Sequence, residues 1–170
     1  MIEDVAVEIR AALRTNLPGA LNTEDAAYSA ADIVEFGEAI VLEDVADRSY
    51  FFEQVEEIVP NDLPAVFILT DGDFQDIPWM TSETHMAWGI EIVAVLPDTD
   101  PRKATRRLWR TMEAIRRVLT QFVEGTDASE PTFQVDISRP DFDPRFRLDA
   151  GGFARTASLR IVAHEVDGRP

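Results

Sequence analysis

The sequence predicts a single α+β domain in which two helices cover one face of a mostly antiparallel sheet of about four strands. Three observations lead to this prediction. The chain has 170 residues, of which 45% are hydrophobic, and this is enough for one domain with its own core. A strongly amphipathic helix is expected over residues 101–123, and segments with strand character lie on both sides of it. The resulting order, an N-terminal helix followed by β-β-α-β-β, is typical of a sheet covered on one face.

The helix expected over residues 101–123 has the clearest boundaries. Asp100 is a good N-cap, and Pro101 suits the first helical position, where its missing N–H costs nothing. One stripe at helical spacing is mostly apolar and is expected to face the core: Ala104, Leu108, Thr111, Met112, Ile115, Leu119 and Phe122. The opposite face is basic and carries Arg102, Lys103, Arg106, Arg107, Arg110, Arg116 and Arg117.

The first 60 residues are predicted to begin with a helix over residues 2–14, which Pro18 and Gly19 end. Residues 16–60 form a variable acidic segment within the domain. A short helix could begin at residues 23–25 and run to residue 31, residues 39–42 could be a short strand, and residues 49–59 could be either. Large apolar side chains in this segment argue against a disordered linker.

Four strands are expected in the rest of the chain. Residues 65–69 form a compact apolar strand, and a turn at residues 70–73 leads into an apolar loop that contains Ile77, Trp79 and Met80 and reaches about Thr84. A long strand covers residues 86–96. Beyond the basic helix, strands at residues 133–137 and 155–166 flank a polar connection from Asp141 to Gly152.

Charge and composition exclude several functions. The net charge is −16, and residues 1–100 hold 22 acidic and 3 basic side chains, whereas residues 101–170 hold 10 acidic and 13 basic ones. This asymmetry indicates pairing within the chain or between copies, and it disfavours nucleic acid as the main ligand. Without cysteine, disulfides and thiolate chemistry are excluded. No apolar run is long enough to span a membrane and no signal peptide is recognisable, so a soluble protein made in the cytoplasm is expected.

Catalytic and metal-binding motifs are weak. Asp71, Asp73 and Asp76 follow a strand, but their spacing does not fit a calcium loop, and Asp and Gly are also the residues that turns favour. His85 is close to these aspartates in sequence, yet no nucleophile elbow or phosphate loop indicates a reaction. We therefore expect no enzyme, no cofactor and no metal site. A metal-dependent hydrolase that uses Asp71, Asp73 and His85 remains a weak alternative.

The basic face of the helix over residues 101–123 is the most suggestive surface. Trp109 lies about 105° from the centre of the apolar stripe, so the monomer is expected to cover it only in part. Trp and Arg together favour protein–protein contacts. The predicted interface, with an acidic surface of another copy and with neighbouring proteins, comprises Arg102, Arg106, Trp109, Arg110, Arg117, Ile77, Trp79 and Met80.

The element order resembles that of the tail terminator proteins of long-tailed phages and related viruses, which are also called tail completion or tail-to-head joining proteins. The resemblance rests on the first helix, Leu63-Pro64-Ala-Val-Phe-Ile-Leu69, the strand Gly89 to Leu96, Asp98-Thr-Asp100-Pro101, the helix with Ala114-Ile115-Arg-Arg-Val-Leu119, and the closing strand Ala154 to Val162. It covers about residues 60–166 and the first helix.

This resemblance implies a structural virion protein without catalysis. Its subunits would form a ring, a hexamer by analogy, that caps the tail tube, ends tube growth and joins tail to head. The implied partners are other copies, the tail tube protein and the head–tail connector, with no membrane or sequence-specific nucleic acid. The protein would be assembled in the host cytoplasm and reside in the tail–neck region of the virion. Another head–tail neck protein is the closest alternative, and a small-ligand-binding regulatory domain with a closed pocket is a further one.

Overall fold

The structure is a computed structural model, and it describes residues 2–52, 60–78, 84–123, 133–148 and 151–165. The helices are α1 (Ile2–Phe36) and α2 (Pro101–Val123), with short 3-10 turns η1 (Asp47–Ser49) and η2 (Pro60–Asp62). The strands are β1 (Tyr50–Phe51), β2 (Ala65–Pro78), β3 (Thr84–Pro97), β4 (Phe133–Ile137), β5 (Asp141–Phe142), β6 (Phe146–Arg147) and β7 (Phe153–Glu165).

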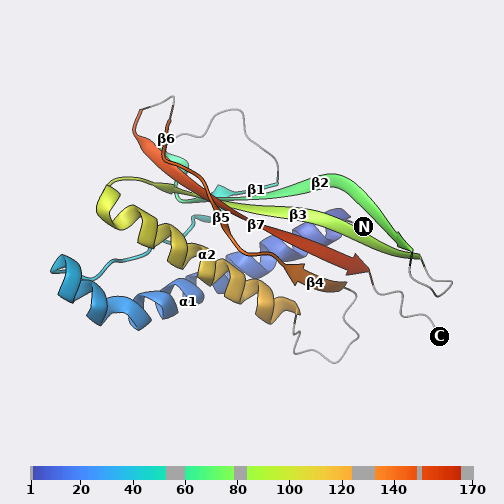
Figure 1. The fold of residues 1–170 in the computed structure, drawn as a ribbon, viewed down its shortest axis with the longest axis horizontal. Coiled ribbons are helices and arrows are strands. Elements are labelled where there is room, and N and C mark those ends of the chain that lie inside the picture. The colour runs from blue at the N-terminus through green and yellow to red at the C-terminus, as the bar shows by residue number, and fades with distance from the viewer. Residues whose placement is uncertain (1, 53–59, 79–83, 124–132, 149–150, 166–170) are drawn as a thin grey trace.

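Among the described residues, two helices lie on one face of a seven-stranded sheet (Figure 1). The strand order is β1-β2-β3-β7-β4, and β5 and β6 also pair with β7. The predicted α+β class is confirmed. The four expected strands form an antiparallel path, but the sheet is larger than predicted and is mixed, because β1 pairs with β2 in parallel.

The helix α1 continues through Pro18 and Gly19, so the prediction that it ends there was wrong. Proline lacks the N–H of an interior helical residue and bends a helix at a cost of roughly 3 kcal/mol. Figure 1 shows the axis of α1 changing direction in its middle. The helix persists because apolar positions on both sides of Pro18 share one buried face: Val5, Ala6, Ile9, Leu13, Leu17, Ala20 and Leu21. The helix considered possible over residues 23–31 is therefore the second half of α1.

The C-terminal end of α1 is closed by Gly37, which has φ +80° and donates its N–H to the carbonyl of Ile33 at 3.0 Å. Residues 38–46 then run back alongside the helix without regular secondary structure. The strand considered for residues 39–42 does not form. The N–H groups of Ile40 and Leu42 instead donate to the carboxylates of Asp32 and Asp25 on α1, so they are not available to a neighbouring strand.

The strand β2 is longer than predicted. Residues 70–78, expected as a turn and loop, continue the antiparallel pairing with β3 as far as Pro78 opposite Thr84. A shift of register between Thr70 and Phe74 accommodates the polar residues 71–73 as a β-bulge. An Asp-Gly-Asp sequence can therefore interrupt a hairpin without ending it. Of the predicted loop residues, Ile77 lies in β2, and Trp79 and Met80 lie outside the described residues.

Residues 133–148 run antiparallel to β7 in three short pieces. Ile137 pairs with Ile161, Asp141 with Ser158 and Phe146 with Ala154, so one extra residue enters at each interruption. Pro140 and Pro144 occupy these interruptions, where no ladder N–H is required. The polar connection predicted from Asp141 to Gly152 is thus in part a broken strand. Its return to β7 uses Gly151 and Gly152, both with φ +93°.

The apolar core lies between the sheet and the two helices. Asp100 caps α2 as predicted, since its Oδ1 accepts the N–H of Arg102 at 3.0 Å. The predicted stripe is confirmed for the six residues from Ala104 to Leu119, all of which are buried. A smaller cluster on the other face of the sheet, centred on Phe67, Val95 and Leu148, covers only part of that face.

The continuity of α1 predicts how alanine at two glycine positions changes the stability of the protein. Gly19 lies inside α1 with open space where a Cβ would be placed, so Gly19→Ala is expected to stabilise the protein by about 0.5–1 kcal/mol. Gly37 also has open space, but its positive φ disfavours alanine, so Gly37→Ala is expected to destabilise by about 1 kcal/mol. Urea denaturation of the two variants measures both effects, and each is the matched control for the other. If α1 ended at Gly19, the first substitution would not stabilise.

Candidate functional site

The basic face of α2 lies against an acidic face of α1. Ion pairs join the two helices along their length: Arg110 with Asp32, Arg106 with Glu35, and Arg117 with Glu24, at 2.6, 2.5 and 2.6 Å respectively. Lys103 adds a pair with Glu38, just beyond the end of α1. Part of the charge asymmetry of the sequence is therefore explained by ion pairs within the chain. Pairing within the chain is one of the two explanations given for it above, the other being pairing between copies.

Asp32 is the centre of this arrangement. Its side chain is fully buried, and its two carboxylate oxygens accept hydrogen bonds from Nη1 and Nη2 of Arg110, both at 2.6 Å. The N–H of Ile40 donates to the same carboxylate at 3.2 Å. The bidentate Arg110 contact, together with the Ile40 N–H, holds the pKa of Asp32 below its usual value despite burial, and it raises the pKa of Arg110.

Asp25 also accepts a hydrogen bond from residues 38–46, but its pKa shifts in the opposite direction from that of Asp32. Both of its oxygens accept the N–H of Leu42, at 3.2 and 3.1 Å, so it also holds residues 38–46 against α1. Removal from water raises the pKa of Asp25, and the N–H of Leu42 and the more distant Arg110 offset this effect only in part.

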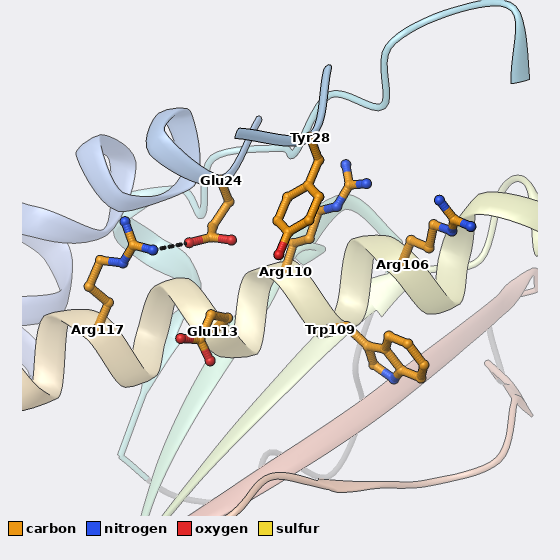
Figure 2. A pocket seen from close by; sticks show the side chains of 7 residues that line it. All are labelled: Glu24, Tyr28, Arg106, Trp109, Arg110, Glu113 and Arg117. Atoms are coloured by element: carbon orange, nitrogen blue, oxygen red, sulfur yellow. Dashed lines mark ion pairs between the residues drawn. The ribbon is translucent and has the colours of Figure 1, made fainter. Parts of the chain in front are cut away.

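A groove of about 580 Å³ crosses the outer surface of this helical layer (Figure 2). Its lining residues are Glu24, Tyr28, Arg106, Trp109, Arg110, Glu113 and Arg117. The guanidinium of Arg110 lies 4.6 Å from the centre of the Tyr28 ring, while Trp109 projects on the opposite side of α2 (Figure 2). The arginines are paired with carboxylates and the two aromatic rings are about half exposed. The groove therefore offers flat aromatic surface between neutralised charges.

A second aromatic region lies beside α2 and includes Trp109. Its indole, 56% exposed, contacts Phe142 of β5 edge to face, with ring centres 6.0 Å apart. Nearby along β7, the guanidinium of Arg145 lies 3.6 Å from the ring centre of exposed Phe153. Arg145 is anchored there by the buried carboxylate of Asp98 at 2.8 Å. We call Trp109, Phe142 and Phe153 the aromatic flank.

The predicted interface residues have different positions. Arg102 is 81% exposed, and Trp109 is partly covered, as expected. Arg110 is a correction: it is buried and paired with Asp32, so it does not face another copy. Arg106 and Arg117 are about 40% exposed, and both have partners within the chain. Ile77 lies on a different element, paired with His85 in the sheet.

The residues of the hydrolase alternative are not neighbours along the sheet. His85 lies opposite Ile77, which is four residues from Asp73 and six from Asp71 along β2. At about 3.3 Å per residue, the backbone positions of Asp73 and His85 are about 13 Å apart. Within the part of the chain that the structure describes, no group of three or more His, Asp or Glu side chains is placed to hold a metal ion.

Sequence reasoning missed Glu24, Tyr28, Asp32 and Phe142. The first three lie at helical spacing, i, i+4 and i+8, and match the spacing of the arginines on α2. This signal was present in the sequence. Pro18 hides this signal, because a proline at this position favours a helix end and so separates residues 24–35 from the first helix.

Comparisons with known proteins do not assign a family. No protein-family model matches the chain, and no curated protein sequence matches it. None of the helices in the described ranges has the length and apolar character required to cross a membrane. Together, the fold and the site define an α+β protein whose helical layer carries an aromatic groove.

The buried ion pair predicts a large and specific effect on stability. Asp32→Asn leaves Arg110 buried without its counter-charge and is expected to cost about 3 kcal/mol, the lower end for such pairs, because Arg110 also borders the groove. Glu35→Gln breaks the more exposed pair with Arg106 and is expected to cost at most about 1 kcal/mol. Urea denaturation measures both. In Asp32→Asn/Arg110→Met neither charge remains, so most of the loss should be recovered; failure to recover would contradict the electrostatic explanation.

The same pair predicts a pH dependence. Because the pKa of Asp32 is lowered on folding, its contribution to stability is complete above the unfolded value of 3.8 and is lost as the pH falls below it. The stability difference between the wild type and Asp32→Asn should therefore shrink below pH 3.8 and stay constant between pH 5 and 7. The contribution of Asp25, whose pKa is raised, has the opposite sign, and only the part of it that does not depend on the charge of Asp32 cancels in this difference. A constant difference down to pH 2 would contradict this assignment.

Proposed function

We propose that this chain is a structural assembly protein, a tail terminator that forms a ring on the end of a viral tail tube, stops tube growth and joins the tail to the head. The observation that carries the proposal is the exposed Trp109 with Phe142, next to a groove whose charged groups are already paired. Exposed aromatic surface without a free reactive group favours protein contact over chemistry.

The sheet supports this proposal with a second uncovered surface. On the face away from the helices, a hollow of about 310 Å³ is lined by polar residues of β3, β7 and the segment before β5, including Glu91, Ser158 and Arg160. A subunit in a ring that lies between a tube and a connector requires surfaces for several neighbours. The aromatic groove and this polar hollow lie on opposite faces of the protein and can serve different partners.

The element order gives the proposal its specific form. The first helix, the β2–β3 hairpin, α2 and the closing strand β7 follow one another as the resemblance to tail terminators requires. The proposed partners are other copies of the chain, the tail tube protein and the head–tail connector, in the neck of the virion after assembly in the host cytoplasm. A neighbouring neck protein would use the same surfaces and is the alternative within this class.

Alternatives from other classes have less support. A hydrolase that uses Asp71, Asp73 and His85 would require these residues to converge, whereas their backbone positions in β2 and β3 are several residues apart. A small-ligand regulatory domain would be expected to enclose its ligand. The larger hollow lined by described residues is instead a surface groove, with Trp109 and Tyr28 about half exposed.

The proposal is tested with the purified chain and the tail tube protein encoded in the same genome. The chain is added while tube protein polymerises, and tube lengths and ends are measured by negative-stain electron microscopy. We expect shorter tubes that carry ring-shaped density at one end. Trp109→Ala should reduce the fraction of capped ends, because Trp109 has the largest exposed ring of the aromatic flank.

The control is Val7→Ala, since Val7 is 48% exposed on α1 far along the chain from the groove. It should cap tubes as the wild type does. Light scattering of the free chain shows whether the ring forms before it meets a tube. Tubes that keep growing without terminal density in the presence of excess chain would overturn the proposal, and equal capping by Trp109→Ala would overturn the role of the groove.

A further inference from the structure

The outward face of the second half of α1 carries no charge. Measured from Asp32, which faces α2, the positions between about 100° and 220° around the helix point away from the protein. They are occupied by Thr23, Ala26, Ala27, Ala30, Ile33 and Val34, all exposed. In a chain with 32 acidic residues, a solvated helix face is expected to be charged. We call these residues the outward face.

Exposure of the larger side chains marks this face as unpartnered within the chain. Val34 is 88% exposed and Ile33 is 52% exposed. Val41, 64% exposed, adds aliphatic surface from residues 38–46, which Asp25 and Asp32 hold alongside the same half of the helix. The alanines leave the helix backbone accessible, so a large ring can approach it closely.

The surroundings of the outward face are acidic. Glu35 and Glu38 follow it in sequence, with side chains 52% and 71% exposed, and each also pairs with a cation of α2, Arg106 and Lys103 respectively. Glu43 and Asp44, also exposed, follow Val41. The surface is therefore small, aliphatic and bordered by carboxylates.

The aromatic flank has the complementary character. Trp109, Phe142 and Phe153 are each between 41% and 56% exposed. The cations around them are Arg102, Arg145 and Arg147, all exposed. This surface is large-ringed and bordered by guanidinium groups.

We propose that the outward face of one copy receives the aromatic flank of a second copy of this chain. The inference rests on the proposed function in that it identifies the subunit contact of the ring. Charge complementarity of the two borders favours a second copy over the tube or connector protein, because this chain already holds both halves of the match. Rings of Trp109 and Phe142 would cover Ala30 and Val34, with arginines at the edge facing Glu35, Glu38 and Glu43.

The positions of the two surfaces determine the symmetry of the contact. α2 lies between α1 on one side and β5 and β7 on the other, so the outward face and the aromatic flank are on opposite sides of the helical layer (Figure 1). One copy cannot bring its own two surfaces together. Contacts between copies are therefore head to tail, and such contacts generate a ring when the rotation between copies closes.

The absence of cysteine makes a direct test available. Val34→Cys is prepared in one copy and Glu113→Cys in another of different mass. Glu113 lies one turn from Trp109 on α2 and has a side chain that is 41% exposed, so Trp109 itself is kept. The two are mixed and treated with a short bismaleimide, first without and then with tube protein. We expect the mixed pair to crosslink several-fold faster than Val7→Cys with Glu113→Cys, the matched control on the first half of α1. Raising the salt concentration should slow the mixed reaction, since the bordering charges are exposed.

Three results would overturn the inference. The first is a crosslinking rate of the mixed pair that is no greater than that of the control pair. The second is faster crosslinking of Val34→Cys with itself, which would indicate an α1–α1 contact. The third is crosslinking of Val34→Cys only to added tube protein. Failure of the proposed function is distinguishable from these. A chain that gives the mixed crosslink but never caps tubes contradicts the tail terminator proposal alone, and a chain that caps tubes without the mixed crosslink contradicts this inference alone.

Discussion

The structure depends on the contact between Asp32 of α1 and Arg110 of α2. Burying two opposite charges is favourable only when their geometry is good and their remaining hydrogen-bonding capacity is used. Here the guanidinium engages both carboxylate oxygens, and the backbone of Ile40 uses the same carboxylate. One side chain therefore positions three segments: the second half of α1, the basic helix and residues 38–46. The other ion pairs between the helices lie on either side of this contact and are more exposed on at least one partner.

The sequence predicted those features that depend on a single local pattern. The stripe of α2, its cap at Asp100 and the strands at residues 65–69, 86–96, 133–137 and 155–166 follow from periodicity and turn residues. The predictions were wrong where tertiary contacts override a local signal. Pro18 favours a helix end, residues 71–73 favour a turn and the prolines after β4 favour a loop, yet packing and pairing with β3 and β7 continue each element.

The candidate site was half predictable for the same reason. Trp109 and the arginines were identifiable because they lie on one helix whose period is clear. Their neighbours Tyr28, Asp32 and Phe142 belong to elements that the sequence left uncertain. The sequence therefore predicted an exposed Arg110, and the burial of this side chain against Asp32 could not be foreseen. Partial exposure of Trp109 followed from its angle on the helix alone, whereas its contact with Phe142 required the register of β5 on β7.

The broken strand beside β7 limits how another strand can add to this edge of the sheet. An unbroken edge strand offers a row of free N–H and carbonyl groups to which another sheet can add without regard to sequence. Pro140 and Pro144 remove donors from this edge, and the extra residue at each interruption turns the remaining groups out of line. Addition of a further strand is thereby disfavoured at residues 138–145. Any contact that another protein makes with this part of the edge must then rely on side chains.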